Sequence, residues 1–131
     1  MTGTPRPDES FTPAPLGALE QQVMDVLWDQ GAMTIRQVIN QLPSEPAYTT
    51  IATVLRNLER KHLVTPERDG HSVRYRARHT REQHAALLME HALAASRDRA
   101  ASMLHFIDAI SPSDVELLRS YLDGRTAGDD R

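Results

Sequence analysis

The spacing of apolar residues changes twice along this chain, and these changes restrict the fold more than any other feature. Between Leu16 and Leu58 apolar residues recur every three or four positions, the period of a helix buried on one side. Between Leu63 and Ala77 they alternate with polar residues, the period of a strand. After Thr80 the helical spacing returns. The sequence therefore predicts a mainly α protein with one small antiparallel hairpin.

Three helices are expected before the hairpin. The first begins near Leu16 and is stopped by Gly31, and the second follows the N-cap Thr34 and ends at Pro43. The third runs from about residue 49 to 61. Three helices before a hairpin are typical of a winged helix-turn-helix domain, which lays its third helix in the major groove of DNA.

The hairpin is predicted to turn at Asp69-Gly70, and Pro66 must occupy a sheet edge or a position without a ladder hydrogen bond. Thr80 is predicted to be the N-cap of a later helix, and the run 111–114 is predicted to begin the last helix with an N-cap, a proline and an acid. We expect a disordered tail (1–13), a winged-helix DNA-binding domain (14–79), a helical dimerisation arm (80–124) and a flexible C-terminal tail (125–131).

The charges are segregated along the chain. The net charge is −3, which by itself argues against a nucleic-acid partner. Residues 48–81, however, contain eight basic and three acidic residues, whereas the segments before and after them are both net acidic. The predicted third helix and hairpin are therefore the basic part of an acidic chain, as expected of a DNA-binding surface.

The outer face of the third helix provides candidates for base recognition. An arginine can pair with guanine, and a threonine methyl can contact the thymine methyl. The base-reading candidates are Thr49, Thr50, Thr53, Arg56 and Asn57. The predicted hairpin forms the wing of such a domain. The candidates for contacts with the DNA backbone, on the third helix and on this wing, are Tyr48, Arg60, Lys61, Arg68, His71, Arg74 and Arg76. Each of these side chains, taken alone, could instead be an ordinary solvent-exposed surface residue. Because they occur together on one helix and one hairpin, a DNA-contacting surface is favoured.

The C-terminal helices have more apolar residues than about 45 residues can bury among themselves, and such a surface usually marks an interface. The alternative is that the arm folds back on its own domain. The candidate dimerisation residues are Leu88, Met89, Leu93, Met103, Phe106, Ile107, Leu118 and Leu122.

Other classes of function find no support in the sequence. The absence of cysteine excludes disulfides and thiolate metal sites, and the histidines at 79, 84 and 91 are not spaced as a metal-binding pair on one helix face. No catalytic constellation is present. We expect no enzyme activity, metal or cofactor. No apolar run has the length of a membrane span or signal peptide, so we expect no membrane insertion and a cytoplasmic location.

Several stretches resemble the penicillinase-repressor family, also called BlaI/MecI/CopY. They are Leu19-Glu20-x-x-Val23-Met24-Asp25-x-Leu27-Trp28, Ala47-Tyr48-Thr49-Thr50-Ile51-x-Thr53-Val54-Leu55-x-x-Leu58-x-x-Lys61, Leu63-Val64, and Asp69-Gly70 before Tyr75. The resemblance covers about Leu16 to Leu122 and implies a winged-helix repressor that binds palindromic operators as a homodimer.

The resemblance also implies control of β-lactam-response or related genes, relieved by proteolysis that depends on a membrane receptor. The corresponding cleavage point is His105-Phe106, although well-known members carry an amide residue where this chain has His105. The copper-responsive branch has C-terminal cysteines, which this chain lacks. A different hypothesis is a winged-helix adaptor that binds a protein rather than DNA.

Overall fold

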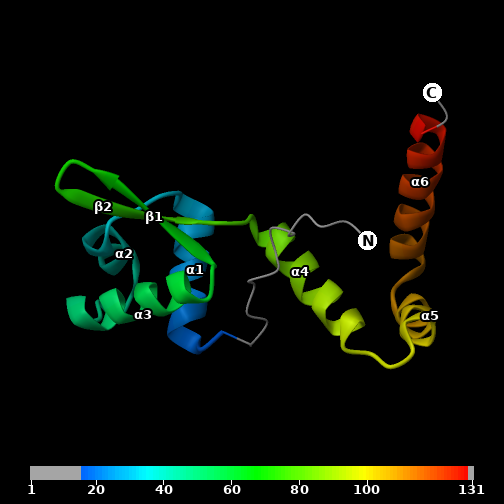
Figure 1. Cartoon of the computed structure of the whole chain (residues 1–131), viewed down its shortest axis with the longest axis horizontal. Helices are drawn as coiled ribbons and strands as arrows, with labels where there is room; N and C mark the ends of the chain where they lie inside the picture. Colours follow the sequence, from blue (N-terminus) through cyan, green and yellow to red (C-terminus); the bar gives the residue numbers. More distant parts are fainter. Residues whose placement is uncertain (1–15, 130–131) are drawn as a thin grey trace, which may run out of the picture. The chain divides into compact units, whose positions relative to one another are not determined.

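The structure is a computed structural model that describes residues 16–129, where it contains six helices and a two-stranded sheet (Figure 1). The elements are α1 (Ala18–Gln30), α2 (Ile35–Gln41), α3 (Tyr48–Arg60), β1 (Val64–Asp69), β2 (Ser72–Ala77), α4 (Arg81–Ala94), α5 (Arg99–Ala109) and α6 (Pro112–Asp129). The predicted mainly α fold with an antiparallel hairpin is confirmed. The tail expected at residues 1–13 lies outside the described residues.

Local signals place the ends of the first three helices. α1 ends at Gly31, whose φ of 91° is a conformation that favours glycine. Thr34 Oγ1 accepts the Gln37 N–H at 3.2 Å, and the Thr34 N–H donates to Gln37 Oε1 at 2.9 Å, which forms a capping box at the start of α2. α3 begins at Tyr48, one residue earlier than expected.

One hydrophobic core joins the first three helices to the base of the hairpin. Its members come from α1, α2, α3 and the segment that enters β1, and all are apolar. They are Val23, Met24, Leu27, Val38, Ile39, Leu42, Ile51, Leu55, Leu58, Leu63 and Val64. Because α3 packs on both α1 and α2, one of its faces is buried and the opposite face is exposed.

The hairpin register differs by one residue from the sequence prediction. Asp69 pairs with Ser72, so the two-residue turn is Gly70-His71 rather than Asp69-Gly70. Gly70 has a φ of 64°, in the left-handed region that glycine adopts without steric cost. This glycine therefore occupies the first position of the turn, where its left-handed conformation is accommodated.

Pro66 occupies a position that requires no backbone donor. It pairs with Tyr75, whose N–H donates to the Met33 carbonyl at 2.7 Å and whose carbonyl accepts the Met33 N–H at 3.0 Å. The backbone hydrogen bonds of Tyr75 therefore go to Met33 and not to Pro66. This satisfies the constraint that a proline places on a sheet.

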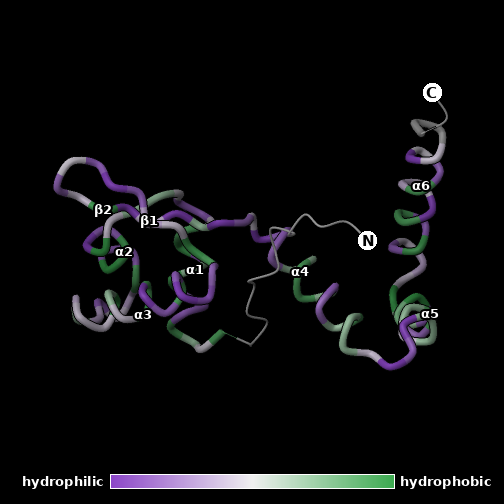
Figure 2. Tube along the Cα trace, in the orientation of Figure 1, coloured by the Kyte–Doolittle hydropathy of each residue, from purple (hydrophilic) through white to green (hydrophobic). Residues whose placement is uncertain are grey.

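The chain forms two compact units, and the division between Met89 and Glu90 lies inside α4, later than the boundary at residue 80 expected from sequence. In the second unit none of residues 90–126 is buried. Figure 2 shows hydrophobic residues recurring along α5 and α6.

α6 continues to Asp129, whereas the sequence predicted a tail from residue 125. Gly124 retains helical geometry, because an isolated glycine weakens a helix without necessarily ending it. Among the described helices, none has the combination of length and apolar character that a membrane span requires.

Candidate nucleic-acid interface

The outer face of α3 presents the predicted base-reading side chains. α3 buries Ile51, Leu55 and Leu58 and packs partly buried Val54 against the same core, so its polar residues lie on the remaining face. The exposed candidates are Thr49, Thr50, Thr53 and Arg56, while Asn57 is half-buried. Hydroxyl, methyl and guanidinium groups on an exposed helix are suited to base edges in a major groove.

Tyr48, in the first turn of α3, contacts a cation that the sequence pattern does not indicate. The guanidinium carbon of Arg36 in α2 lies 5.4 Å from the centroid of the Tyr48 ring, a cation–π distance. Both side chains are exposed. Arg36 precedes the basic segment, and no sequence spacing connects it with α3; the packing of α2 on α3 brings the two residues together.

Lys61 has a protein partner. It is the C-cap residue of α3, and its Nζ lies 3.0 Å from Glu20 Oε2 on α1. The two side chains are only 22% and 16% exposed. The basic side chain of Lys61 at the end of α3 predicts a phosphate contact, but the ion pair with Glu20 instead joins the end of α3 to the start of α1.

The Glu20 carboxyl is kept ionised by this arrangement. Burial by itself would raise its pKa, but the hydrogen bond from the Gly17 N–H and the ion pair with Lys61 outweigh that effect. The pKa of Glu20 is therefore lowered from its ordinary value of 4.5. Arg60, which is exposed in the last turn of α3, also favours the charged carboxylate.

The wing arginines lie on two different faces of the hairpin. Arg74 pairs with Glu67, and Arg76 with Thr65, on one face; Arg68 lies on the other face, opposite Val73. Two of these arginines have nearby partners. Arg76 Nε is 2.7 Å from Glu67 Oε2, and Arg74 Nη1 donates to Gln37 Oε1 at 3.4 Å.

The Arg68 face of the hairpin is the one that adjoins α3. Tyr75, on that face, has a raised pKa, mainly because of burial and also because of the negative charge of Glu59; the positive charges of Arg56 and Arg68 partly offset these effects. The phenol therefore lies within electrostatic reach of one arginine on α3 and one on the wing. The raised pKa keeps the phenol neutral at physiological pH.

A hollow of about 330 Å³ lies between α2, the start of α3 and the wing. It is lined by Thr34, Ile35, Arg36, Tyr48, His71, Ser72, Val73 and Tyr75. His71, in the hairpin turn, is exposed. The hollow thus connects the Tyr48 end of α3 with the wing turn, and both ends have a basic or aromatic side chain.

The candidate dimerisation residues are exposed in the single chain, apart from half-buried Leu93. In the first unit Leu88 and Met89 are exposed. In the second unit the exposed candidates are Met103, Phe106, Ile107, Leu118 and Leu122, and the same unit also exposes Leu104, Leu117 and Tyr121. The apolar surface is therefore larger than the sequence candidates alone.

The proposed cleavage point lies within α5. Both His105 and Phe106 are exposed, and the Phe106 carbonyl accepts the Ile110 N–H at 3.1 Å. Among the described residues, no three histidine, aspartate or glutamate side chains are grouped as a metal site.

Comparison with known proteins gives matches over most of the chain. The sequence profile of the penicillinase repressor family matches residues 16–124. Two relatives, each described as the transcriptional regulator BlaI, come from Mycobacterium tuberculosis strains CDC 1551 / Oshkosh and H37Rv; each is 40% identical over 119 residues, which covers 86% of both chains.

Solved structures give weaker likenesses. A MarR family protein from Bacillus stearothermophilus has a TM-score of 0.47 at 20% identity and covers 96% of this chain and 84% of its own. The zinc-responsive MarR family member ZitR from Lactococcus lactis has a TM-score of 0.46 at 16% identity and covers 92% and 81%. The profile match and the 40% identity are decisive: the protein is a transcriptional regulator, not an enzyme, and it belongs to the penicillinase repressor family.

Proposed function

We propose that this protein is a homodimeric transcriptional repressor that binds a palindromic operator through α3 and the wing. The observation that carries the proposal is the concentration of exposed cations on these elements in a chain that is acidic elsewhere. A basic surface of this kind attracts phosphate by counterion release, and an exposed helix at its centre can enter a major groove. Family membership supports the same function.

The proposed role of each candidate side chain follows from its exposure to solvent and from its partners within the protein. Thr49, Thr50, Thr53 and Arg56 are proposed to contact bases, with half-buried Asn57 at the edge of that face. The proposed backbone contacts are Tyr48, Arg60, Arg68, His71, Arg74 and Arg76, together with Arg36. Among the cationic candidates, Lys61 is the weakest candidate for a phosphate contact, because its ammonium is paired with Glu20.

The exposed apolar side chains of α4, α5 and α6 are proposed to pair with those of a second copy. Two-fold symmetry would present two α3 helices to the two halves of a palindrome, and each half-site would otherwise bind weakly. The bound dimer would block a promoter in the cytoplasm. By relation to the regulators named BlaI, the regulated genes are proposed to belong to a β-lactam response.

Relief by proteolysis is proposed at His105-Phe106. The side chains are accessible, but the peptide bond is within a helix, so α5 must unwind locally before a protease can bind it. Intact-mass analysis after co-expression with a receptor protease tests this step. Fragments ending at His105 are expected, and an uncleaved chain would contradict the proposal.

DNA binding is tested on a duplex selected by the purified protein from a random-sequence pool. Fluorescence anisotropy at several salt concentrations should give a salt-sensitive complex well below about micromolar. Arg56→Ala should change the selected sequence, whereas Arg60→Ala should flatten the salt slope by about one. Arg97→Ala, an exposed arginine outside the winged helix, is the charge-matched control.

Absence of a salt-sensitive complex would overturn the repressor function and favour a winged-helix adaptor for a protein partner. If Arg56→Ala left both affinity and preference unchanged, the assignment of Arg56 as a base-reading residue would be wrong.

A further inference from the structure

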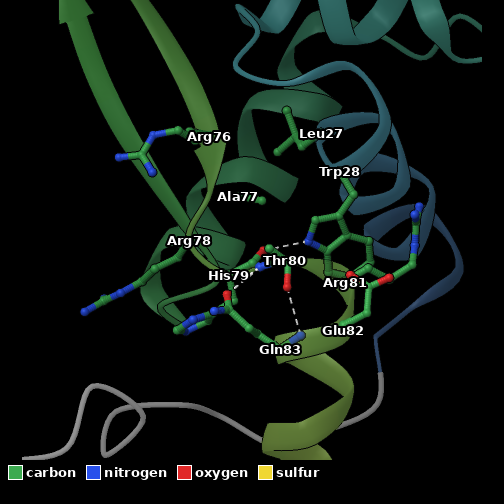
Figure 3. Close-up of a pocket in the computed structure, with 10 residues that line it drawn as sticks. All are labelled: Leu27, Trp28, Arg76, Ala77, Arg78, His79, Thr80, Arg81, Glu82 and Gln83. Carbon is green, nitrogen blue, oxygen red and sulfur yellow. Dashed lines mark hydrogen bonds between the residues drawn. The ribbon is translucent and has the colours of Figure 1, made fainter.

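A cluster of side chains holds the first turn of α4 on α1 (Figure 3). Trp28 of α1 donates its indole Nε1–H to the His79 carbonyl at 2.9 Å. The guanidinium of Arg81 lies 5.1 Å from the Trp28 ring centroid, and the His84 ring lies 5.4 Å from it. The indole of Trp28 is therefore contacted by the loop before α4 through His79, by the first residue of α4, Arg81, and by the first turn of α4 through His84.

Arg81 also forms ion pairs with two carboxylates of α1. Its Nη2 is 3.3 Å from Asp25 Oδ1 and 3.1 Å from Asp29 Oδ1. These aspartates are four residues apart, so they lie on the same face of α1 and flank Trp28. We name the set Asp25, Trp28, Asp29 and Arg81 the Arg81 clamp.

The connection between β2 and α4, beside the clamp, is short and its conformation is restricted. Only residues 78–80 separate the end of β2 from the start of α4. Thr80 and Gln83 form a reciprocal capping box, with hydrogen bonds of 3.0 and 2.8 Å, that determines where α4 begins. The clamp and a hollow of about 450 Å³ beside it, lined in part by Leu27 and Ala77, lie within the first compact unit.

Arg81 is therefore different from the other cations of the basic segment. It is the last of the eight basic residues in 48–81, and sequence position alone would group it with the DNA contacts. Its guanidinium instead contacts two acids and one aromatic ring of α1.

We propose that Arg81 is a positioning residue for operator binding: the Arg81 clamp holds the start of α4 on the winged helix before DNA binds. This inference rests on the proposed homodimeric operator binding, in which α4 begins the arm. A pre-positioned arm start reduces the ordering cost that two recognition helices must overcome when they bind two half-sites together. The clamp contributes to affinity without touching DNA.

Two variants separate this role from a direct phosphate contact. Arg81→Ala removes the cation, and the double variant Asp25→Asn/Asp29→Asn keeps the cation but removes both of its acidic partners. If Arg81 bound phosphate, loss of two negative charges would strengthen DNA binding. The clamp predicts that both variants weaken binding to the selected duplex by about three- to tenfold, because exposed ion pairs and cation–π contacts are individually modest.

The salt slope and the assembly state provide further readouts. Both variants should keep the wild-type salt slope, since no phosphate contact is lost, and sedimentation should show the wild-type oligomeric state. Wild-type affinity in either variant, tighter binding by Asp25→Asn/Asp29→Asn, or a slope reduced by about one in Arg81→Ala would overturn the inference.

Trp28 gives a test that needs no DNA. It is the single tryptophan of the chain, so its fluorescence reports on the clamp directly. Quenching by acrylamide, which is uncharged, should increase in both variants and stay unchanged in Arg97→Ala. Unchanged quenching in the clamp variants would overturn the clamp. Failure of the wild-type protein to select any duplex would instead overturn the proposed function, whatever the fluorescence shows.

Discussion

The cations of the basic segment have different roles at the scale of single residues. Arg56 is exposed on α3, Lys61 is paired with Glu20, and Arg81 is paired with Asp25 and Asp29. A count of positive charges treats them as equivalent. Their partners separate those that remain available for DNA from those that stabilise the domain.

The Glu20–Lys61 pair gives a prediction about pH. The pKa of Glu20 is lowered in the folded state, so its ionised form stabilises the fold at pH values above the ordinary value of 4.5. This contribution is lost as the pH falls through the lower, folded-state pKa. Glu20→Gln should therefore reduce the free energy of unfolding by about 1 kcal/mol near pH 7. Below pH 4.5 the difference from wild type should shrink.

Urea unfolding from pH 7 to pH 3 measures this difference, with Glu45→Gln, an exposed site, as control. A deficit in Glu20→Gln that remained undiminished at pH 3 would contradict the assigned role of the ionised carboxylate.

A second pH dependence concerns His84. Burial beside Trp28, and secondarily the charge of His79, lower the pKa of His84. A lowered histidine pKa favours the neutral ring in the folded state, so stability is full above the ordinary value of 6.5 and decreases as the pH falls from there towards the folded-state pKa. His84→Gln should remove this part of the pH dependence, measured by urea unfolding between pH 7.5 and pH 5. An unchanged profile would contradict it.

At the scale of elements, the wing is a ribbon with two different faces. Arg74 and Arg76 share a face with Glu67, which pairs with Arg76, whereas Arg68 shares a face with Tyr75 towards α3. DNA that contacts α3 is therefore expected to meet the Arg68 side of the ribbon first.

This asymmetry is testable with matched substitutions in one hairpin. Arg68→Ala should lower the salt slope of operator binding by about one, and Arg76→Ala should lower it less, because Arg76 already has a carboxylate partner. Anisotropy titrations at four salt concentrations measure both slopes. A larger loss in Arg76→Ala would mean that the opposite face of the wing meets DNA.

At the scale of the whole molecule, two compact units differ in how they are stabilised. The first has a buried core from three helices and the hairpin. The second has no buried residue among residues 90–126 while several large apolar side chains are exposed. A unit without a core of its own is expected to gain stability from a partner surface.

If the proposed dimer forms through α6, Leu118→Asp should convert it to a monomer, because a charge in an apolar interface is strongly unfavourable. Binding to the proposed operator should then weaken by at least about tenfold, because each half-site binds separately. Ser120→Asp is the control, since it adds the same charge on the opposite side of α6. Sedimentation equilibrium measures the assembly state. A dimeric Leu118→Asp variant would show that this part of α6 is outside the interface.

The sequence by itself determined the order of helices and strands, the helix end at Gly31, the N-caps at Thr34 and Thr80, and the exposed face of α3. These features depend on spacings of a few residues, which periodicity and cap chemistry report directly. The turn of the hairpin was displaced by one residue, and the length of α6 was underestimated, because glycine permits both a turn and a continued helix.

Only the tertiary structure decided which cations have partners. Lys61 meets Glu20 across 41 positions, and Arg81 meets Asp25 and Asp29 across 56 and 52 positions. The strand register likewise places Arg68 and Arg74 on opposite faces of the hairpin, and the packing of α2 on α3 brings Arg36 to Tyr48. Such pairings depend on how distant elements approach one another, and local spacing contains no information about that approach.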